Sequence, residues 1–434
     1  MRKPALQQPD WGDPSQVRRI REVLAARPPL VKAEDVRVLR TLLAQVARGE
    51  ALVVQGGDCA ENPGECDAEY VSRKSAVLDL LAATLKMATH KPVVRVGRIA
   101  GQFAKPRSRP FERIGDLELP VYRGHMVNGP EYDPESRRHD PLRLLTSYMT
   151  ACDVMEHLGW RGPAALGHQP LIEHRLWTSH EALVLDYEVP MIRELGDGRR
   201  WLGSTHWPWI GERTRQPDGA HLDLVAGIVN PVSVKVGPTA TLEEITVLCE
   251  RLDPLREPGR LTLIARMGAE MVADRLPALV EAVRVAGHPV IWLSDPMHGN
   301  TMVGPDGHKT RLLETMAREI RGFLRAVTDV GGTAGGLHLE TTPDDVLECA
   351  ADVSVYEGKA VRRTSLCDPR LNPEQAASLV SAWSHADVRP TASGDGSWMD
   401  REAQTIPGGR SLPGGPEYQE FEPRNHSALP LNQT

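Results

Sequence analysis

Four residues of the types that bind transition metals stand at, or just after, short apolar runs that are far apart in the chain. They are Cys59, His298, Glu340 and Asp368. A thiolate, an imidazole and two carboxylates together suit a borderline divalent metal such as Mn, Fe, Co or Zn. Each residue alone has an ordinary explanation: a buried small thiol, a hydrogen-bonded loop histidine, or carboxylates that cap helices or form ion pairs. Their shared position after apolar runs is what favours a metal site.

A second set of side chains at similar places is cationic. Its members are Arg98, Lys105, Arg213, Lys235 and Arg266. Cations at the ends of apolar strands are costly to bury without a partner. A bound phosphate and carboxylate would justify them, because Arg offers a bidentate fork and Lys a point charge. The alternatives are internal ion pairs with Glu212 or Asp295 and, for Lys105, Arg107 and Arg109, a solvated loop.

These residues need a scaffold that brings them together, and the pattern of the chain predicts one. Short runs rich in β-branched residues are predicted as strands at 51–57, 92–98, 206–211, 232–237, 261–266, 289–295 and 336–340, with a last short element before residue 367. Amphipathic helices are predicted at 68–88, 242–252, 270–286, 310–327, 343–349 and 373–385. Apolar strands that alternate with helices indicate a parallel sheet, and about eight such units fit a closed (β/α)8 barrel. The carboxyl ends of barrel strands converge on one face, so both sets of side chains would share one pocket.

The barrel is expected to form only part of the chain. We expect an N-terminal helical extension over residues 1–50, the barrel over 51–385, and a tail over 386–434 that lacks periodicity and is predicted to be disordered. The extension contains helical patterns at 16–26 and 34–47. Residues 99–204 are too long for one connection, which predicts an insertion after the second strand with helices at 142–158 and 179–194.

Composition restricts the class of protein. The 434 residues contain 51 Lys and Arg against 58 Asp and Glu, a net charge of −7, which argues against nucleic acid or an anionic membrane as the main partner. No apolar run approaches the ~20 residues of a membrane span, and the first residues show no signal peptide. The six scattered cysteines are typical of reduced thiols. A cytoplasmic location is therefore predicted.

The motifs around these residues resemble one family, the class II 3-deoxy-D-arabino-heptulosonate 7-phosphate (DAHP) synthases. The resemblance extends over roughly residues 5–385 and rests on the segments QGGDCAE, GRIAGQFAKPRS, TSHEALVLDYE, WIGERTRQPDGAH, NPVSVKVGP, SDPMHGNT, GGLHLE and CDPRLN. It implies a metal-dependent (β/α)8 barrel and the first reaction of the shikimate pathway. That reaction condenses phosphoenolpyruvate (PEP) with erythrose 4-phosphate (E4P) and water to give DAHP and phosphate.

The resemblance also implies roles for individual positions. The implied metal ligands are Cys59, His298, Glu340 and Asp368. The implied PEP site comprises Arg98, Glu212, Arg213, Lys235 and Arg266. The implied catalytic and aldose-phosphate residues are Lys105, Arg107, Ser108, Asn300 and Thr301. Mn²⁺ or Co²⁺ is the expected metal, with Zn²⁺ or Fe²⁺ as alternatives, and the chain is expected to form a homodimer.

Two departures from the family pattern bear on the substrate and on regulation. The usual Arg-Gly-Asp triplet reads Arg123-Gly124-His125 here, which leaves open an aminoDAHP synthase that takes an aminated tetrose phosphate. The insertion after the second strand is shorter than in feedback-regulated members, which predicts weak or absent inhibition by Phe, Tyr and Trp. A non-catalytic regulatory barrel is the third alternative, and the complete set of ligands and cations disfavours it.

Overall fold

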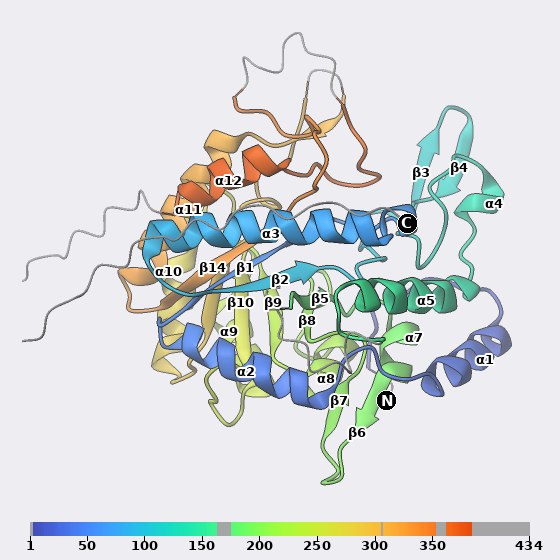
Figure 1. The fold of residues 1–434 in the computed structure, drawn as a ribbon, viewed down its shortest axis with the longest axis horizontal. Helices are drawn as coiled ribbons and strands as arrows, with labels where there is room; N and C mark the ends of the chain where they lie inside the picture. Colours follow the sequence, from blue (N-terminus) through green and yellow to red (C-terminus); the bar gives the residue numbers. More distant parts are fainter. Residues whose placement is uncertain (1–2, 163–174, 305–306, 353–361, 384–434) are drawn as a thin grey trace, which may run out of the picture. The chain divides into compact units, whose positions relative to one another are not determined.

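Eight parallel strands form a closed barrel in the computed structural model, which describes residues 3–162, 175–304, 307–352 and 362–383 (Figure 1). Around the barrel the strands follow the order β1-β14-β11-β10-β9-β8-β5-β2. Their bounds are β1 Leu52–Gly57, β2 Val93–Arg98, β5 Trp177–Glu181, β8 Trp207–Ile210, β9 Val232–Val236, β10 Leu261–Ala265, β11 Ile291–Ser294 and β14 Thr333–Glu340. The predicted (β/α)8 barrel with an N-terminal helical extension and an insertion after the second strand is confirmed.

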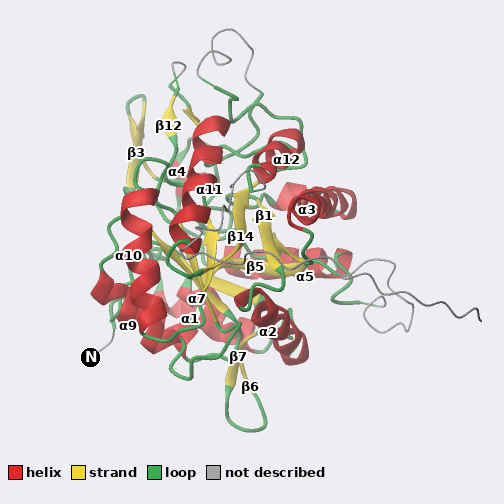
Figure 2. Ribbon diagram, turned by 90° about the vertical axis from the view of Figure 1, so that its left-hand side faces the viewer, coloured by secondary structure: helices red, strands yellow, loops and turns green. Residues whose placement is uncertain are grey.

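Helices surround the barrel, as Figure 2 shows with red helices outside yellow strands. Their bounds are α3 Ala68–Thr89, α8 Ala220–Ala226, α9 Leu242–Leu252, α10 Val272–Val285, α11 Leu313–Thr328 and α12 Pro373–Ser381. Local sequence sets several of their starts. Helix α9 begins with a capping box between Thr241 and Glu244, and α12 begins with one between Asn372 and Gln375.

The amino-terminal helices α1 (Pro14–Ala25) and α2 (Ala33–Ala47) precede the first strand. Leu39, Leu43 and Val46 of α2 pack in one buried cluster with the inward-facing side chains of the barrel strands, among them Trp207 and Ile291. Helix α2 therefore seals one end of the barrel with apolar contacts. The functional side chains collect at the other end, where the strands finish.

The third barrel strand corrects the prediction of a helix over residues 179–194. Strand β5 occupies the start of that segment, followed by the short helices α7 (Leu185–Glu188) and η2 (Val189–Met191) and by β6 (Ile192–Glu194), which pairs with β7 (Arg200–Leu202). The strand hides its polar side chains by hydrogen bonding: Ser179 Oγ donates to Gly97 O, and His180 Nε2 lies 2.9 Å from Glu188 Oε1. Because buried polar residues replace the apolar run, the strand carried no recognisable pattern.

Two further expectations near the end of the barrel are wrong. Residues 343–349 are not helical, because their backbone bonds elsewhere: Leu347 N donates to Arg362 O, and Thr342 just before them donates to Leu371 O. With β5 as a barrel strand, the eighth strand is β14, and residues 362–366 contain no strand before Cys367. The remainder of that predicted element, and the predicted tail at 386–434, lie outside the described residues.

In its described residues, the insertion between β2 and β5 contains a hairpin and two helices. Strands β3 (Phe111–Ile114) and β4 (Leu117–Pro120) pair antiparallel, and the helices are α4 (Pro134–Arg137) and α5 (Leu142–His157). Helix α5 confirms the helix predicted at 142–158. A second small hairpin, β12 (Met302–Val303) with β13 (Lys309–Thr310), follows β11.

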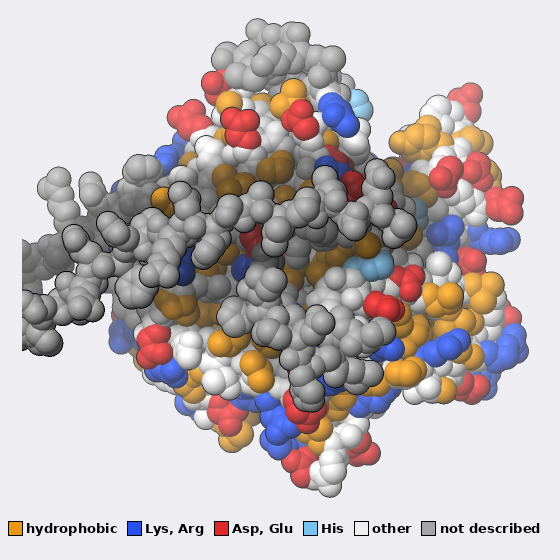
Figure 3. All heavy atoms as spheres, in the orientation of Figure 1, with side chains coloured by type: hydrophobic (Ala, Val, Ile, Leu, Met, Phe, Trp, Pro, Cys, Tyr) orange, Lys and Arg blue, Asp and Glu red, His pale blue; other side chains and the backbone are white. Residues whose placement is uncertain are grey.

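Among the described helices, none combines the length and the apolarity that a membrane crossing requires. On the face drawn in Figure 3, basic and acidic side chains are interspersed where described atoms are visible. Mixed charge of this kind is typical of a solvated surface.

A glycine at the closure of the barrel provides a test of the fold. Gly336 of β14 pairs with Val53 of β1, has φ +141°, and would place a Cβ only 1.9 Å from Val53 O. We therefore expect Gly336→Ala to lower the free energy of unfolding by about 3 kcal/mol or more, measured by urea denaturation. Gly196→Ala is the control, since a Cβ there meets nothing within 4 Å. Equal stability of the two variants would contradict this account of barrel closure.

Candidate active site

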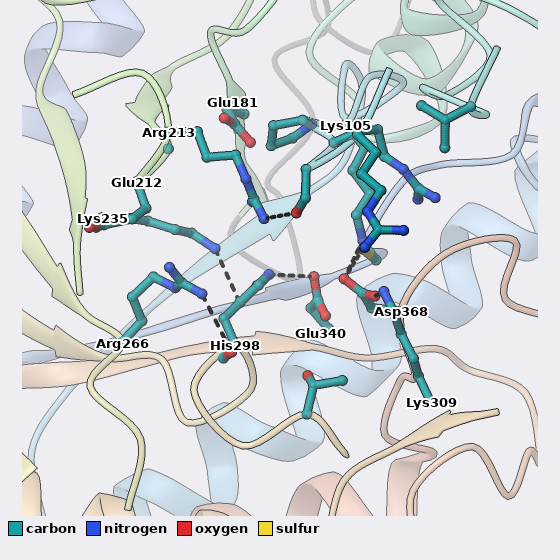
Figure 4. Close-up of a pocket in the computed structure, with 18 of the residues that line it drawn as sticks. Lys105, Glu181, Glu212, Arg213, Lys235, Arg266, His298, Lys309, Glu340 and Asp368 are labelled. Carbon is teal, nitrogen blue, oxygen red and sulfur yellow. Dashed lines mark hydrogen bonds and ion pairs between the residues drawn. The ribbon is translucent and has the colours of Figure 1, made fainter. Parts of the chain in front are cut away.

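A cavity of about 730 Å³ opens at the carboxyl end of the barrel strands. Every candidate site residue predicted from the sequence lines it except Asn300, and Figure 4 shows the side chains of Lys235, His298, Glu340 and Asp368 converging there. The lining candidates are Cys59, Arg98, Lys105, Arg107, Ser108, Glu212, Arg213, Lys235, Arg266, His298, Thr301, Glu340 and Asp368. The barrel thus brings together residues that are up to about 310 positions apart.

Three of the four candidate metal ligands form a tight buried cluster. The ligand atoms of Cys59, Glu340 and Asp368 all lie within 4.8 Å of one another, and Cys59 Sγ lies 3.9 Å from Asp368 Oδ2. His298 stands at the edge of this cluster, with Nε2 3.3 Å from Glu340 Oε1. A thiol, an imidazole and two carboxylates at such separations match the donor set of a divalent transition metal.

Two lysine side chains contact this cluster. Lys105 Nζ lies 2.7 Å from Cys59 Sγ and forms an ion pair with Asp368, whose other oxygen lies 2.8 Å from Lys309 Nζ. Burial acts to raise the pKa of Asp368, but Lys105 foremost, with Arg311 and Lys309, holds it well below its usual value. The carboxylate is therefore ionised. The residues present fit a divalent cation.

His298 is oriented by a buried carboxylate. Its Nδ1 lies 2.8 Å from Asp295 Oδ2, which directs Nε2 toward Glu340. Histidine ligands of metals commonly donate their other ring N–H to a carboxylate in this way. Burial acts to raise the pKa of Asp295, and His298 and Lys235 hold it well below its usual value.

Arg98 and Glu340 meet because of the strand register. Gly57 of β1 pairs with Glu340 of β14 on one side and with Arg98 of β2 on the other. Arg98 Nη2 donates to Glu340 Oε1 at 3.2 Å, while Arg311 Nη1 donates to Oε2 at 2.8 Å. Two guanidinium groups therefore balance this buried carboxylate.

A hydrogen-bonded chain in the barrel interior fixes the Arg98 guanidinium. His338 Nε2 accepts from Arg98 Nη1 at 2.7 Å, and His338 Nδ1 donates to Gln55 Oε1, also at 2.7 Å. Burial, assisted by Lys235 and Arg98, lowers the pKa of His338 well below its usual value, so the ring is neutral and can accept. The aromatic face of Trp209 lies 5.3 Å from the guanidinium carbon.

The remaining cations differ in how fully they are paired. Lys235 Nζ lies 3.0 Å from Asp295 Oδ2. This lysine therefore has an internal ion-pair partner, as one of the two sequence-based alternatives predicts. Glu212 pairs instead with Arg215 and accepts from Gly237 N at 2.7 Å. Within the described residues Arg266 forms no ion pair, and its Nε is buried without a hydrogen-bond partner. An anionic ligand would satisfy it.

Asn300 and His125 do not line the cavity, whereas Thr301 lines it beside Arg311. Asn300 braces the loop after β11, since its Nδ2 donates to Glu319 Oε2 and its Oδ1 accepts from Ala269 N. Thr301 Oγ1 accepts from Arg311 Nε at 2.9 Å. His125 packs against Tyr122, with ring centroids 5.7 Å apart, and does not line the cavity.

Several residues that line or support the cavity are not predicted from the sequence. They are Gln102, Glu181, Trp209, Lys309 and Arg311. Glu181 ends β5, where the sequence predicts a helix, and Trp209 lies inside β8, where nothing in the sequence distinguishes a cavity-lining tryptophan from a core one. Lys309 depends on the β12–β13 hairpin. A carboxylate directly before an apolar segment, as in TSHEALV, was the one available signal for Glu181.

Comparison with known proteins identifies the family. The family model described as the Class-II DAHP synthetase family matches residues 1–165 and 161–383. A probable phospho-2-dehydro-3-deoxyheptonate aldolase of Pseudomonas fluorescens is 59 % identical over 379 residues, covering 87 % of this chain and 94 % of its own length. Phospho-2-dehydro-3-deoxyheptonate aldolases of Streptomyces coelicolor and Mycolicibacterium smegmatis are each 39 % identical, cover 87 % of this chain, and are themselves covered over 94 % and 91 %.

A closed parallel barrel with a cavity lined by carboxylates and cations at the carboxyl ends of its strands is the architecture of a (β/α)8 enzyme. The chain belongs to the class II DAHP synthetase family, and its enzyme class is that of the 3-deoxy-7-phosphoheptulonate synthases.

Glu181 gives a pH-dependent prediction. Burial raises its pKa above the usual value, although Lys235, Arg98, His298 and Arg213 oppose the rise. Folding therefore favours its protonated form, and the wild type loses stability as the pH rises from the usual carboxyl pKa of ~4.3 toward the raised value. Glu181→Gln cannot ionise, so we expect its Tm relative to wild type to improve between about pH 5 and about pH 8.

The matched control is Glu118→Gln in the exposed part of the β3–β4 hairpin, whose Tm difference from wild type should not vary with pH. A Tm difference for Glu181→Gln that is the same at both pH values would contradict the prediction.

Proposed function

We propose that this chain condenses PEP with E4P and water in a metal-dependent reaction that yields DAHP and phosphate. The observation that carries the proposal is one cavity in which a buried thiol–carboxylate cluster lies beside a wall of cations. The two substrates bring two phosphates and a carboxylate, and the cavity offers more positive side chains than its own carboxylates neutralise. Family membership supports the same reaction.

The cations of the cavity wall are proposed to hold PEP. Arg98 and Lys235 line the cavity beside the ring of Trp209. Arg266 lines it too and donates to His298 O, and Arg213 donates to Ser108 Oγ. Arg98 is fixed by His338 and Glu340, which favours a preorganised guanidinium over a mobile one. Glu212 is proposed to act by holding Arg215 and the backbone of Gly237.

The metal ligands are proposed to be Cys59, His298, Glu340 and Asp368, with Mn²⁺ or Co²⁺ as the metal and Zn²⁺ or Fe²⁺ as alternatives. A divalent metal bound there would supply a Lewis acid for the aldehyde oxygen of E4P. Lys105 keeps its proton, because the pKa of its ammonium group is raised by Cys59 and Asp368 in spite of burial. With Arg107 and Ser108 it is proposed to face the aldose phosphate.

The bonds of the reaction balance without a further reactant. Carbon 3 of PEP bonds to the aldehyde carbon as the C2–C3 double bond of PEP and the π bond of the aldehyde open, and the oxygen of water bonds to carbon 2. The bond between carbon 2 and the bridging phosphate oxygen then breaks, and the oxygen from water becomes the keto oxygen of carbon 2. Of the two protons of water, one ends on the new hydroxyl group and the other on the released phosphate. The fixed charges of the cavity orient both anions for this step.

E4P is the proposed aldose, since His125 does not line the cavity and gives no support to an aminated substrate. We further propose weak or absent inhibition by aromatic amino acids. In the described residues, the connection from β2 to β5 contains only the β3–β4 hairpin, α4 and α5. A homodimer in the cytoplasm, with the extension at 1–50, the barrel at 51–385 and the tail at 386–434, completes the proposal.

The reaction and its metal dependence can be tested together. We expect phosphate release and a product with the mass of DAHP only when PEP, E4P and Mn²⁺ or Co²⁺ are all present. Treatment with a chelator should remove more than about 90 % of the activity, and added metal should restore it. Full activity after chelation would contradict metal dependence, and PEP consumption only with an aminated tetrose would contradict E4P as substrate.

Regulation has its own test. Phe, Tyr and Trp, added singly and together at about millimolar concentration, should leave initial rates within about twofold of the uninhibited rate. Loss of turnover with the mixture would show that a regulatory site exists and would overturn this part of the proposal.

A further inference from the structure

Four buried charged side chains form a continuous chain behind the proposed metal ligands. Lys74 Nζ lies 2.7 Å from Asp58 Oδ2, Asp58 Oδ1 accepts from Arg370 Nη1 at 2.7 Å, and Arg370 Nη2 donates to Glu348 Oε1 at 3.3 Å. The exposed fraction of these residues is 7 % for Lys74 and 3 % or less for the other three. None of them lines the active-site cavity, so the charges serve no substrate directly.

The chain of charges joins two segments that carry metal ligands. Asp58 directly precedes Cys59 in the segment after β1, and Arg370 follows Asp368 by two residues in the segment after β14. Their ion pair spans 312 positions of sequence. Lys74 adds the surrounding helix α3 to the same set. Whatever holds Asp58 against Arg370 therefore also sets how far Cys59 lies from Asp368.

The segment that carries Asp368 is held by hydrogen bonds to the side chain of Glu348. This carboxylate accepts from the backbone N–H groups of Thr364, Ser365 and Arg370 at 3.0, 2.8 and 2.7 Å. Arg370 also donates to Thr364 Oγ1 at 2.6 Å, so its planar guanidinium is fixed in three directions. A loop with this many directional bonds has little freedom to move its ligand.

The energetics favour a positioning role over a purely stabilising one. Buried ion pairs rarely stabilise a fold more than apolar side chains of the same size would, because desolvation offsets the attraction between the charges. What such pairs do provide is direction, since each hydrogen bond is satisfied in one geometry only. Here the Asp58–Arg370 ion pair fixes the segments on both sides of the 3.9 Å distance between Cys59 Sγ and Asp368 Oδ2.

We propose that Asp58 and Arg370 are positioning residues that hold Cys59 and Asp368 at the separation a divalent metal requires. The inference rests on the proposed metal site and assigns the metal affinity of that site to a pair of residues that touch neither metal nor substrate. Partners of metal ligands typically change metal affinity by about 10–100-fold when they are replaced.

Two variants separate positioning from folding. Asp58→Leu/Lys74→Met removes one negative and one positive charge, replaces a buried ion pair by apolar side chains, and leaves Arg370 its bond to Glu348. Arg370→Lys keeps the charge but offers one nitrogen in place of two, so it does not reproduce the fork in which Nη1 bonds Asp58 while Nη2 bonds Glu348 and Thr364. Arg73→Gln is the control, since it breaks an exposed ion pair of the same helix, with Asp344 at 3.0 Å.

The probe is Co²⁺ alone, with its affinity measured by competition with a chelator and its thiolate charge-transfer absorption recorded in the same titration. We expect both test variants to bind Co²⁺ at least about 10-fold more weakly than wild type, with a reduced absorption band. The double variant should keep a Tm close to that of wild type, and Arg73→Gln should match wild type in both readouts.

Co²⁺ affinity within twofold of wild type in Arg370→Lys, with an unchanged band, would overturn the inference even if its Tm falls. If the double variant does not fold, Arg370→Lys decides the question. Failure of the wild type itself to bind Co²⁺ would instead overturn the proposed metal site, so the two failures are distinguishable.

Discussion

The carboxyl end of the barrel depends on the balance of buried charge. Cys59, Glu340 and Asp368 place three acidic or polarisable groups within 4.8 Å of one another, away from bulk water. Such a cluster is unfavourable unless cations are close. The chain supplies them from several elements: Arg98 and Arg311 on Glu340, and Lys105 and Lys309 on Asp368. A divalent metal and anionic substrates would enter a site already built from alternating charges.

The barrel makes this balance possible through its register. Glu340, Gly57 and Arg98 stand at one level on three neighbouring strands, and glycine is needed at 57 because a Cβ there would lie 2.7 Å from Arg98 O. Two residues earlier on β1 and β14, Gln55 and His338 pair with each other, and His338 accepts a hydrogen bond from Arg98 inside the barrel. At the opposite end, apolar side chains of helix α2 pack against the inward-facing side chains of the barrel strands. The apolar cluster that stabilises the barrel and the side chains that could do chemistry thus lie at opposite ends of the strands.

The parts that could be predicted from sequence are those with a local signal. Apolar runs disclosed seven barrel strands, and polar residues at their ends disclosed the candidate ligands and cations. Strand β5 had no such signal, because His180 and Ser179 are buried by hydrogen bonds rather than by apolar character, and Glu181 was missed with it. The partners of each charge could not be predicted either. That Lys235 pairs with Asp295, or Arg311 with Glu340, depends on register and loop paths that span the whole chain.

The most direct test of the central claim is anomalous X-ray diffraction from crystals of the wild-type chain grown with Co²⁺ and measured at the cobalt absorption edge. We expect one strong anomalous peak, bounded by Cys59 Sγ, His298 Nε2 and the carboxylates of Glu340 and Asp368, at bonding distances of about 2.0–2.4 Å. A peak elsewhere in the molecule, or none at this cluster at full Co²⁺ loading, would contradict the claim that the carboxyl end of the barrel is a metal-dependent active site.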